Sequence, residues 1–481
     1  MHGELNKILN KKLQRKREEQ DNQDEKCFGY DFVESLKSCS KKRDIDKGIR
    51  IHSYVLKKGL LEKIPHLVCA LINMYAKCGM LAKAHDVLEE SCFQNVFCWN
   101  ALIGGYAHHG QAHDAVSCYE QMQSEGLFPD EVTLTCILKA CGRLGAIDKG
   151  KQLHGKIMNR NLLKKDVVLG NALVDMYIKC GAFSEANELL EELPIRDVAS
   201  WNSVIGGYGQ DIQGHKALDC FERMQNDGLS PDAITFICVL KTMRSIEKGR
   251  RMHEEIVRRG LLEMDNIMLG NVLVDMYAKC GALIDAQKVL KELPVRDIVS
   301  WNALIAGYAQ QGKCHETLAC FEQMKSEGLS PDSITLVCIL KACGSIKAID
   351  MGIQVHDEVM ARGLLQNNIV LGNALLDMYA KCGELTKAQE VLEQLPIRDV
   401  VSWNVLIAGY AQDNQGHEVL KCFERMQTEG HFPDPVTFIC VLKACGSTGA
   451  IGKGKQIHDL IISRHMLQKD IKLGTVLVDM Y

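Results

Sequence analysis

The feature that most constrains this chain is an internal repeat of about one hundred residues. The four tryptophans, each followed by Asn, recur at steps of 102, 100 and 102 residues, at Trp99, Trp201, Trp301 and Trp403. Each long repeat divides into related segments of 35, 36 and 31 residues, as in 96–130, 131–166 and 167–197. Repeat periods of this size signify a solenoid, in which each unit buries its apolar face against its neighbours.

Each short segment predicts two helices. In segment 298–332, apolar residues recur at three- and four-residue spacing from Trp301 to Tyr308, which gives a first helix one apolar face. Gly312 ends this helix and a second apolar stripe follows. Gly328 and the Pro331-Asp332 pair end the second helix, because proline removes a donor and restricts the preceding residue. We therefore expect an all-α fold, an α-solenoid of stacked helix-turn-helix repeats whose first helices line a long groove.

The repeats also divide the chain. Residues 1–28 lack the repeat and carry a basic run followed by an acidic run, which predicts a solvated, charged leader. Divergent segments of the 36- and 31-residue types occupy 29–95, and the regular tandem array spans 96–470. Residues 471–481 begin another 31-residue segment but stop where every earlier copy continues. We therefore expect an incomplete last repeat, as in a fragment or a truncated gene product.

One 36-residue segment is irregular. Three residues are missing after Lys241-Thr242-Met243-Arg244, and one extra residue near Asn266 restores part of the length. We expect a tighter hairpin there, with local disorder or altered spacing of the repeats.

The formal net charge of −4 argues against a protein held to nucleic acid mainly by phosphate contacts. Acidic residues of the second helices still leave the groove free to be neutral or basic, and contacts to bases tolerate this charge. These acids include Glu191, Glu192, Glu322 and Glu327. No run approaches eighteen apolar residues, so we expect no membrane span.

The 21 cysteines follow the repeat and are never spaced as C-x-x-C. Free cysteine behaves as a small buried hydrophobe. We therefore interpret these residues as packing residues in a reducing compartment, and expect neither a disulfide framework nor a zinc site.

The segment lengths and the words SWNALIAGYAQ, ITLVCILKACG and VLGNALVDMYAKCG resemble the pentatricopeptide repeat family, over residues 29–481. Within it they resemble the plant subfamily that alternates P-, L- and S-type repeats. The resemblance implies a right-handed α-solenoid that binds single-stranded RNA, roughly one base per repeat, in mitochondria or chloroplasts. The leader is rich in acids and is no clear transit peptide, so only the resemblance indicates an organelle.

In that family a base is read by the fifth residue of a repeat together with the last. The resemblance assigns Asn with Asp to seven repeats, a pairing that favours uracil over cytosine and either over purines. The P-type pairs are Asn100 with Asp130, Asn202 with Asp232, Asn302 with Asp332, and Asn404 with Asp434. The S-type pairs are Asn171 with Asp197, Asn271 with Asp297, and Asn373 with Asp399.

The L-type repeats depart from this pattern. Thr135 with Asp166 resembles a guanine-preferring pair, whereas an aliphatic fifth residue cannot hydrogen-bond a base and predicts a spacer. The aliphatic pairs are Ile237 with Asn266, Val337 with Asn368, and Ile439 with Asp470, and the divergent pair Cys69 with Asn95 has no readable preference. From residue 96 onward the expected target is 5′-U-(G)-U-U-n-U-U-n-U-U-n.

Ordinary structural roles compete with base recognition at these positions. An Asp before a helix is a good N-cap, and Asn near a helix start can be a local cap. Asn recurs one turn into seven first helices, where Ala would favour helix more, and this indicates a task in the groove. Valines near helix starts either sandwich bases or pack internally, namely Val132, Val299, Val401 and Val436.

No catalytic motif is present. Many members of the subfamily carry a zinc cytidine deaminase domain, which needs H-x-E and P-C-x-x-C. His253 and His356 each begin an H-x-E match, but both lie in repeat helices of a chain without C-x-x-C. We expect no enzymatic activity, cofactor or metal in the chain as given.

The first hypothesis is a sequence-specific single-stranded RNA-binding protein, a specificity factor in organellar C-to-U editing. The deaminase would act in trans or belong to a missing C-terminus. A second hypothesis is a protein-binding scaffold of the tetratricopeptide type, although a uniform period of about 34 residues does not fit these segments. A third is a truncated, non-functional gene copy, suggested by the near-identical units and the incomplete last repeat.

Overall fold

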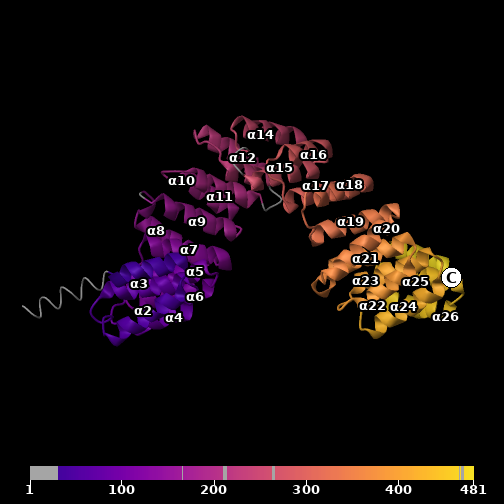
Figure 1. Ribbon diagram of the computed structural model, residues 1–481, viewed down its shortest axis with the longest axis horizontal. Coiled ribbons are helices and arrows are strands. Elements are labelled where there is room, and N and C mark those ends of the chain that lie inside the picture. The colour runs from indigo at the N-terminus through magenta and orange to yellow at the C-terminus, as the bar shows by residue number, and fades with distance from the viewer. Residues whose placement is uncertain (1–30, 165, 210–213, 263–265, 465, 467–470) are drawn as a thin grey trace, which may run out of the picture. The chain divides into compact units, whose positions relative to one another are not determined.

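The structure, a computed structural model, describes residues 31–164, 166–209, 214–262, 266–464, 466 and 471–481. In these residues every regular element is a helix and there is no strand, which confirms the predicted all-α class. Figure 1 shows the helices following one another as antiparallel pairs. The leader predicted for residues 1–28 lies outside the described residues.

The helices form two compact units, Met1–Thr242 and Met243–Tyr481. In the first unit, residues 31–42 are helical and precede the second helix α2 (Ile45–Lys57). The first helices that follow are α3 (Pro65–Lys77), α5 (Val96–His108), α7 (Glu131–Leu144), α9 (Val167–Lys179), α11 (Val198–Tyr208) and α13 (Ala233–Thr242). Their second helices are α4 (Leu81–Glu89), α6 (Ala112–Ser124), α8 (Ile147–Asn159), α10 (Phe183–Glu192) and α12 (Gly214–Asn226), and a short 3-10 helix η1 (Leu162–Lys164) precedes α9.

The second unit repeats this arrangement, beginning with the second helix α14 (Ile246–Arg258). Its first helices are α15 (Ile267–Lys279), α17 (Ile298–Gln310), α19 (Ser333–Ile346), α21 (Ile369–Cys382), α23 (Val400–Gln412), α25 (Pro435–Thr448) and α27 (Ile471–Met480). The other second helices are α16 (Leu283–Glu292), α18 (Cys314–Ser326), α20 (Ile349–Ala361), α22 (Leu385–Gln394), α24 (Gly416–Thr428) and α26 (Ile451–Ser463), and a 3-10 helix η2 (Leu364–Asn367) precedes α21.

Within each unit the first helices stack directly on one another. Helix α17 packs on α15 before it and α19 after it, and the other first helices of a unit do the same. The stripe predicted from Trp301 to Tyr308 is buried in this stack. Gly307 permits the close approach, because a Cβ there would lie 2.8 Å from the Cβ of Ala278 on α15. The sequence periodicity thus produces the solenoid arrangement of each unit, as predicted.

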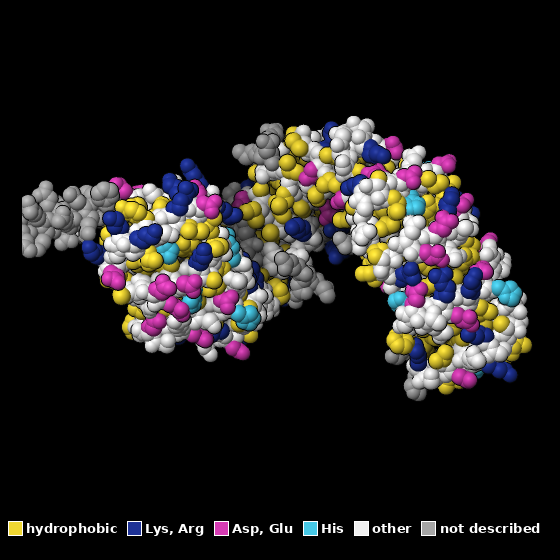
Figure 2. All heavy atoms as spheres, turned by 60° about the horizontal axis from the view of Figure 1, so that its bottom comes forward, with side chains coloured by type: hydrophobic (Ala, Val, Ile, Leu, Met, Phe, Trp, Pro, Cys, Tyr) yellow, Lys and Arg dark blue, Asp and Glu magenta, His cyan; other side chains and the backbone are white. Residues whose placement is uncertain are grey.

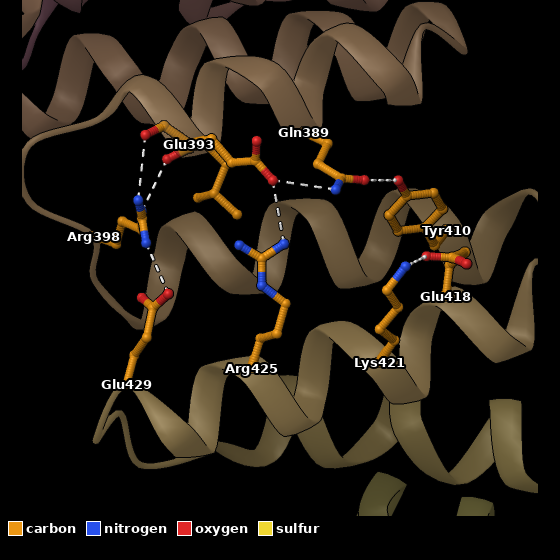
Figure 3. A network of polar contacts seen from close by, with 9 residues as sticks. Gln389, Glu393, Arg398, Tyr410, Glu418, Lys421, Arg425 and Glu429 are labelled. Atoms are coloured by element: carbon orange, nitrogen blue, oxygen red, sulfur yellow. Dashed lines mark hydrogen bonds and ion pairs between the residues drawn. The ribbon is translucent and has the colours of Figure 1, made fainter.

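Polar contacts join successive hairpins. At each junction from an L-type to an S-type repeat, a second-helix histidine Nδ1 lies 2.8–3.0 Å from a first-helix tyrosine hydroxyl. At the junction of α22, α23 and α24, Arg425 donates to Glu393 at 3.3 Å and Arg398 donates to Glu429 at 2.7 Å (Figure 3). These contacts tie the second helix of one hairpin to the hairpin beside it.

In the irregular repeat, the three missing residues shorten the first helix, α13. Helix α13 has 10 residues, whereas its counterparts α7, α19 and α25 each have 14. The boundary between the two compact units follows directly, after Thr242. The shortened helix thus lies at the irregular repeat, and the expected change in spacing or local disorder stays a prediction, because residues 263–265, near the extra residue, lie outside the described residues.

The expectation of a tighter hairpin at this repeat is wrong. The connection from α13 to α14 comprises residues 243–245, one residue more than the connection 145–146 between α7 and α8. The second helix keeps its register because Gly249 fits against Met276, as Gly150 fits against Met176 in the regular repeat. Since packing fixes where the second helix begins, the deletion shortens the end of the first helix.

Candidate nucleic-acid interface

The structure brings each predicted Asn–Asp pair into hydrogen-bond contact. In all seven pairs the Asn Nδ2 donates to the Asp carboxylate, with a shortest distance between 2.8 and 3.2 Å. The pairs are Asn100–Asp130, Asn171–Asp197, Asn202–Asp232, Asn271–Asp297, Asn302–Asp332, Asn373–Asp399 and Asn404–Asp434. Residues 26 or 30 positions apart thus form one recurring polar site between adjacent first helices.

The backbone explains why the two side chains meet. The Asn lies one turn into a first helix, and the Asp is the N-cap of the first helix in the next repeat. Asp332, for example, accepts from the backbone N–H groups of Ile334 and Thr335, each at 2.9 Å, as well as from Asn302. The capping role and the contact with Asn are therefore functions of the same carboxylate.

Sequence reasoning missed a third member of this site, a Ser or Thr at the third position of each next helix. In five of the seven pairs its buried hydroxyl donates to the Asn Oδ1, at 2.7 Å from Ser402 to Asn373 and 2.6 Å from Thr437 to Asn404. Equivalent bonds come from Thr133, Ser200 and Thr335. Asn202 and Asn271 are the exceptions, because Thr235 donates to Asp232 and Ser300 donates to the carbonyl of Asp297. The recurrence of Ser or Thr three residues after the Asp was the available signal.

This arrangement fixes the orientation of the amide. In the five pairs that contain this bond, the nitrogen faces the carboxylate and the oxygen faces the hydroxyl, so each atom retains one further hydrogen-bonding position. Burial raises the pKa of Asp197, but the backbone N–H and hydroxyl of Ser200 and the Asn171 amide outweigh it and leave the pKa below its ordinary value. The carboxylate is thus an anion at neutral pH, and it holds the Asn with one N–H free.

An exposed apolar residue accompanies the polar site at the second position of most first helices. The four valines considered in the sequence, Val132, Val299, Val401 and Val436, are 52–56% exposed, so the alternative of internal packing is wrong for them. Equivalent exposed residues that the sequence analysis did not single out are Phe97, Val168, Ile234, Met268, Ile334 and Val370. Exposed apolar side chains beside amides suit a ligand with apolar faces and polar edges.

Two hollows of the first unit are lined by these side chains together with basic residues. One, of about 480 Å³, is lined by Asn100, Val132 and Lys77. The other, of about 640 Å³, is lined by Asn202, Lys179 and Lys241. The hollows lie on the first helices, whereas the acids named in the sequence belong to the second-helix layer, where Glu191 pairs with Arg223 at 2.8 Å. Figure 2 shows Lys and Arg interspersed with Asp and Glu on the face that it draws.

The L-type positions do not form the same site. Thr135 donates its hydroxyl to the carbonyl of Glu131 at 2.8 Å, and Asp166 caps α9 through the N–H of Leu169 at 3.0 Å. No hydrogen bond joins these two described residues. Asn368 likewise caps α21, and Asn266 donates to the carbonyl of Leu261. Ile237, Val337 and Ile439 are half-buried, and Asp470, the partner expected for Ile439, lies outside the described residues.

The histidines that begin H-x-E matches have structural partners. His253 and His356 contact the hydroxyls of Tyr277 and Tyr379 at 3.0 and 2.8 Å. The described residues contain no cluster of His, Cys, Asp or Glu that could hold a metal ion. In the same residues, no helix has the length and apolar character that crossing a bilayer requires.

Family models match the chain at the segments that form this site. A model described as the PPR repeat family matches residues 94–143, 196–245, 296–345 and 398–447. A model described as the PPR repeat matches residues 67–92, 171–198, 271–298 and 373–400. The first set spans the P-type Asn–Asp pairs, and the second spans the S-type pairs.

Similar proteins carry names of the same kind. A mitochondrial pentatricopeptide repeat-containing protein of Arabidopsis thaliana is 34% identical over 91% of this chain, which spans 42% of that protein. A chloroplastic one from the same plant is 32% identical over 86% of this chain, which spans 67% of that protein. A crystal structure of the pentatricopeptide repeat protein PPR10 with an 18-nucleotide psaJ RNA element is 17% identical, covers 91% of this chain and 75% of that chain, and has a TM-score of 0.48.

Proposed function

Because the chain belongs to the pentatricopeptide repeat family, we propose that it binds single-stranded RNA along its first helices. The observation that carries the proposal is the Asn–Asp contact, repeated in seven repeats beside an exposed apolar side chain. Each repeat then offers one polar site and one apolar surface, which suits one unstacked base.

The hydrogen-bonding groups favour uracil. A pyrimidine edge presents donors and acceptors side by side, and the Asn amide retains one N–H donor and one oxygen lone pair. The carboxylate prevents the amide from turning over. A base whose donor and acceptor are exchanged would therefore place its donor against the amide N–H and its acceptor against the amide oxygen. We therefore assign base reading to the Asn–Asp pairs, with uracil preferred, and regard the L-type repeats as spacers. The missing contact between Thr135 and Asp166 removes the geometric support for a guanine site there.

The same proposal places the chain in organellar RNA modification, as a specificity factor for C-to-U editing. Support comes from the family and from the mitochondrial and chloroplastic names of its relatives. The editing chemistry would come from a deaminase-bearing protein acting with this chain. A peptide-binding scaffold is the weaker alternative, because it assigns no task to the Asn–Asp pairs.

Competition between strands tests the RNA-binding proposal. The probe is a fluorescent single-stranded 11-mer, UGUUAUUAUUA. The unlabelled strand should displace it at a concentration at least tenfold lower than the RNA duplex of the same sequence requires, because base pairing hides the base edges. Anisotropy at physiological salt measures both, with the single-stranded DNA of the same sequence as a further competitor. Equal displacement by strand and duplex would contradict base recognition, and no binding of the strand would contradict the proposal altogether.

A further inference from the structure

The hollow beside Asn100 has an unusual electrostatic character. It lies among α3, α5 and α7, has a volume of about 480 Å³, and is lined by Lys41, Arg43, Lys77 and His108. None of the residues that line it is acidic. The corresponding hollow beside Asn202 contains Asp175 in addition to its basic residues.

The repeats of the chain itself show what has changed at Lys77. In three later S-type repeats the equivalent lysine is held by an aspartate four residues earlier on the same helix. These ion pairs are Lys179–Asp175 at 2.6 Å, Lys279–Asp275 at 2.6 Å and Lys381–Asp377 at 2.7 Å. In α3 the aspartate is replaced by Asn73, which also lines the hollow. Lys77 therefore has no carboxylate partner within the described part of the chain.

The neighbouring cations lack a direct carboxylate partner as well, because Glu34, the acid near Lys41, pairs with Lys37 at 2.7 Å. Lys41 and Arg43 form no ion pair among the described residues, and both are exposed. The acid nearest to them in sequence, Asp44, is occupied as the N-cap of α2, where it accepts from the N–H of Lys47 at 3.1 Å. Three permanent cations therefore surround one hollow, and an anion entering it would meet no repelling carboxylate on the wall.

We propose that this hollow binds a phosphate group of the RNA, on the 5′ side of the nucleotide at Asn100 and Asp130. The inference rests on the proposed function and on a parallel orientation of the RNA, in which the 5′ end lies toward the N-terminal repeats. A phosphate there replaces counterions around the unpaired cations, which adds affinity without adding base preference. The phosphate is either a terminal 5′-monophosphate or the phosphodiester of a longer strand.

Three RNAs separate these sources. All contain UGUUAUUAUUA: the first begins with a 5′-hydroxyl, the second with a 5′-monophosphate, and the third with three added 5′ adenosines. The full chain should bind the second and third at least threefold more tightly than the first. If only the 5′-monophosphate RNA binds more tightly than the 5′-hydroxyl RNA, the hollow is a terminal phosphate site. If the extended RNA also binds more tightly, it is a general phosphate site. Equal affinity for all three RNAs overturns the inference.

The chain supplies a conservative variant for this test. N73D restores the aspartate–lysine pair that three other repeats already contain, so it should fold, which circular dichroism checks. Because it pairs Lys77 and brings a carboxylate to the wall while Lys41 and Arg43 remain, it should reduce the threefold gain in affinity, and it should reduce the slope of log affinity against log salt by about 0.7 for each phosphate that the hollow no longer binds. D275N, which releases Lys279 in a repeat of the second unit, is the matched control and should leave the gain intact.

The outcomes separate this inference from the proposed function. If N73D keeps the full gain, the hollow does not bind phosphate, even when the RNA is bound with its uracil preference. If no RNA of the three is bound at micromolar concentration, both the proposed function and the inference fail.

Discussion

Replacing Trp301 with Ala is expected to lower the free energy of unfolding by about 3–5 kcal/mol, the cost typical of removing a buried aromatic side chain. Trp301 is 1% exposed in the core of its repeat, and its Nε1 donates to Glu327 at 3.0 Å. The substitution leaves a cavity and removes one of the donors to this carboxylate, which Arg296 also contacts at 3.1 Å. Urea unfolding followed by circular dichroism measures the effect. The repeats around residue 301 should unfold at a lower urea concentration than the others, because a solenoid is stabilised by contacts between nearest neighbours.

Val299, two residues earlier on the same helix, provides the control. It is 55% exposed, so V299A should change the unfolding free energy by no more than about 0.5 kcal/mol. If W301A and V299A had similar small effects, the buried tryptophans would not be the centre of the repeat core.

Removing the Asn side chain from three P-type repeats should reduce affinity for UGUUAUUAUUA at least tenfold. The variant N202A/N302A/N404A loses three amides that we assign to base reading, and its preference for uracil over adenine should approach one. The fold should persist because Asp232, Asp332 and Asp434 still cap their helices, through backbone N–H groups at 2.8–2.9 Å. Anisotropy titrations of the variant and the original chain with both RNAs measure the change.

A matched variant removes amides from the second-helix layer. N187A/Q287A/Q389A deletes three side chains of α10, α16 and α22, whose contacts are to other protein groups. Its affinity for the same RNA should stay within about twofold of the original. If both triple variants bound RNA like the original chain, the Asn residues would be only structural.

The helices were predictable because their signals are local. Two successive stripes of apolar residues, the first starting at Trp301, indicated the two helices of this hairpin. Gly312 and Gly328 follow their ends closely, whereas Pro331 lies beyond the end of α18 at Ser326. Base-reading candidates depended on a resemblance, because a contact between Asn302 and Asp332, 30 residues away, follows from helix stacking and not from any local pattern. The sequence left capping and base reading as alternatives for the Asp residues, and in the structure the same carboxylate both caps a helix and holds the Asn amide.

Features that depend on neighbouring repeats could not be predicted in the same way. The hydroxyl of Thr437 meets Asn404 only because α25 lies beside α23. The deletion near Thr242 was located correctly, but its effect depended on which helix end was free to shorten. The isolated Thr135 likewise could not be foreseen, because its hydroxyl turns back to its own helix.

Base reading by the Asn–Asp pairs is tested most directly by comparing how the intact chain binds UGUUAUUAUUA and the RNA in which every U is replaced by A. Both strands have the same length and charge, so phosphate contacts contribute equally and only base recognition separates them. If the pairs read uracil, the uracil strand should bind at least tenfold more tightly at physiological salt. Equal affinity for the two strands would contradict the assignment of base reading to these pairs.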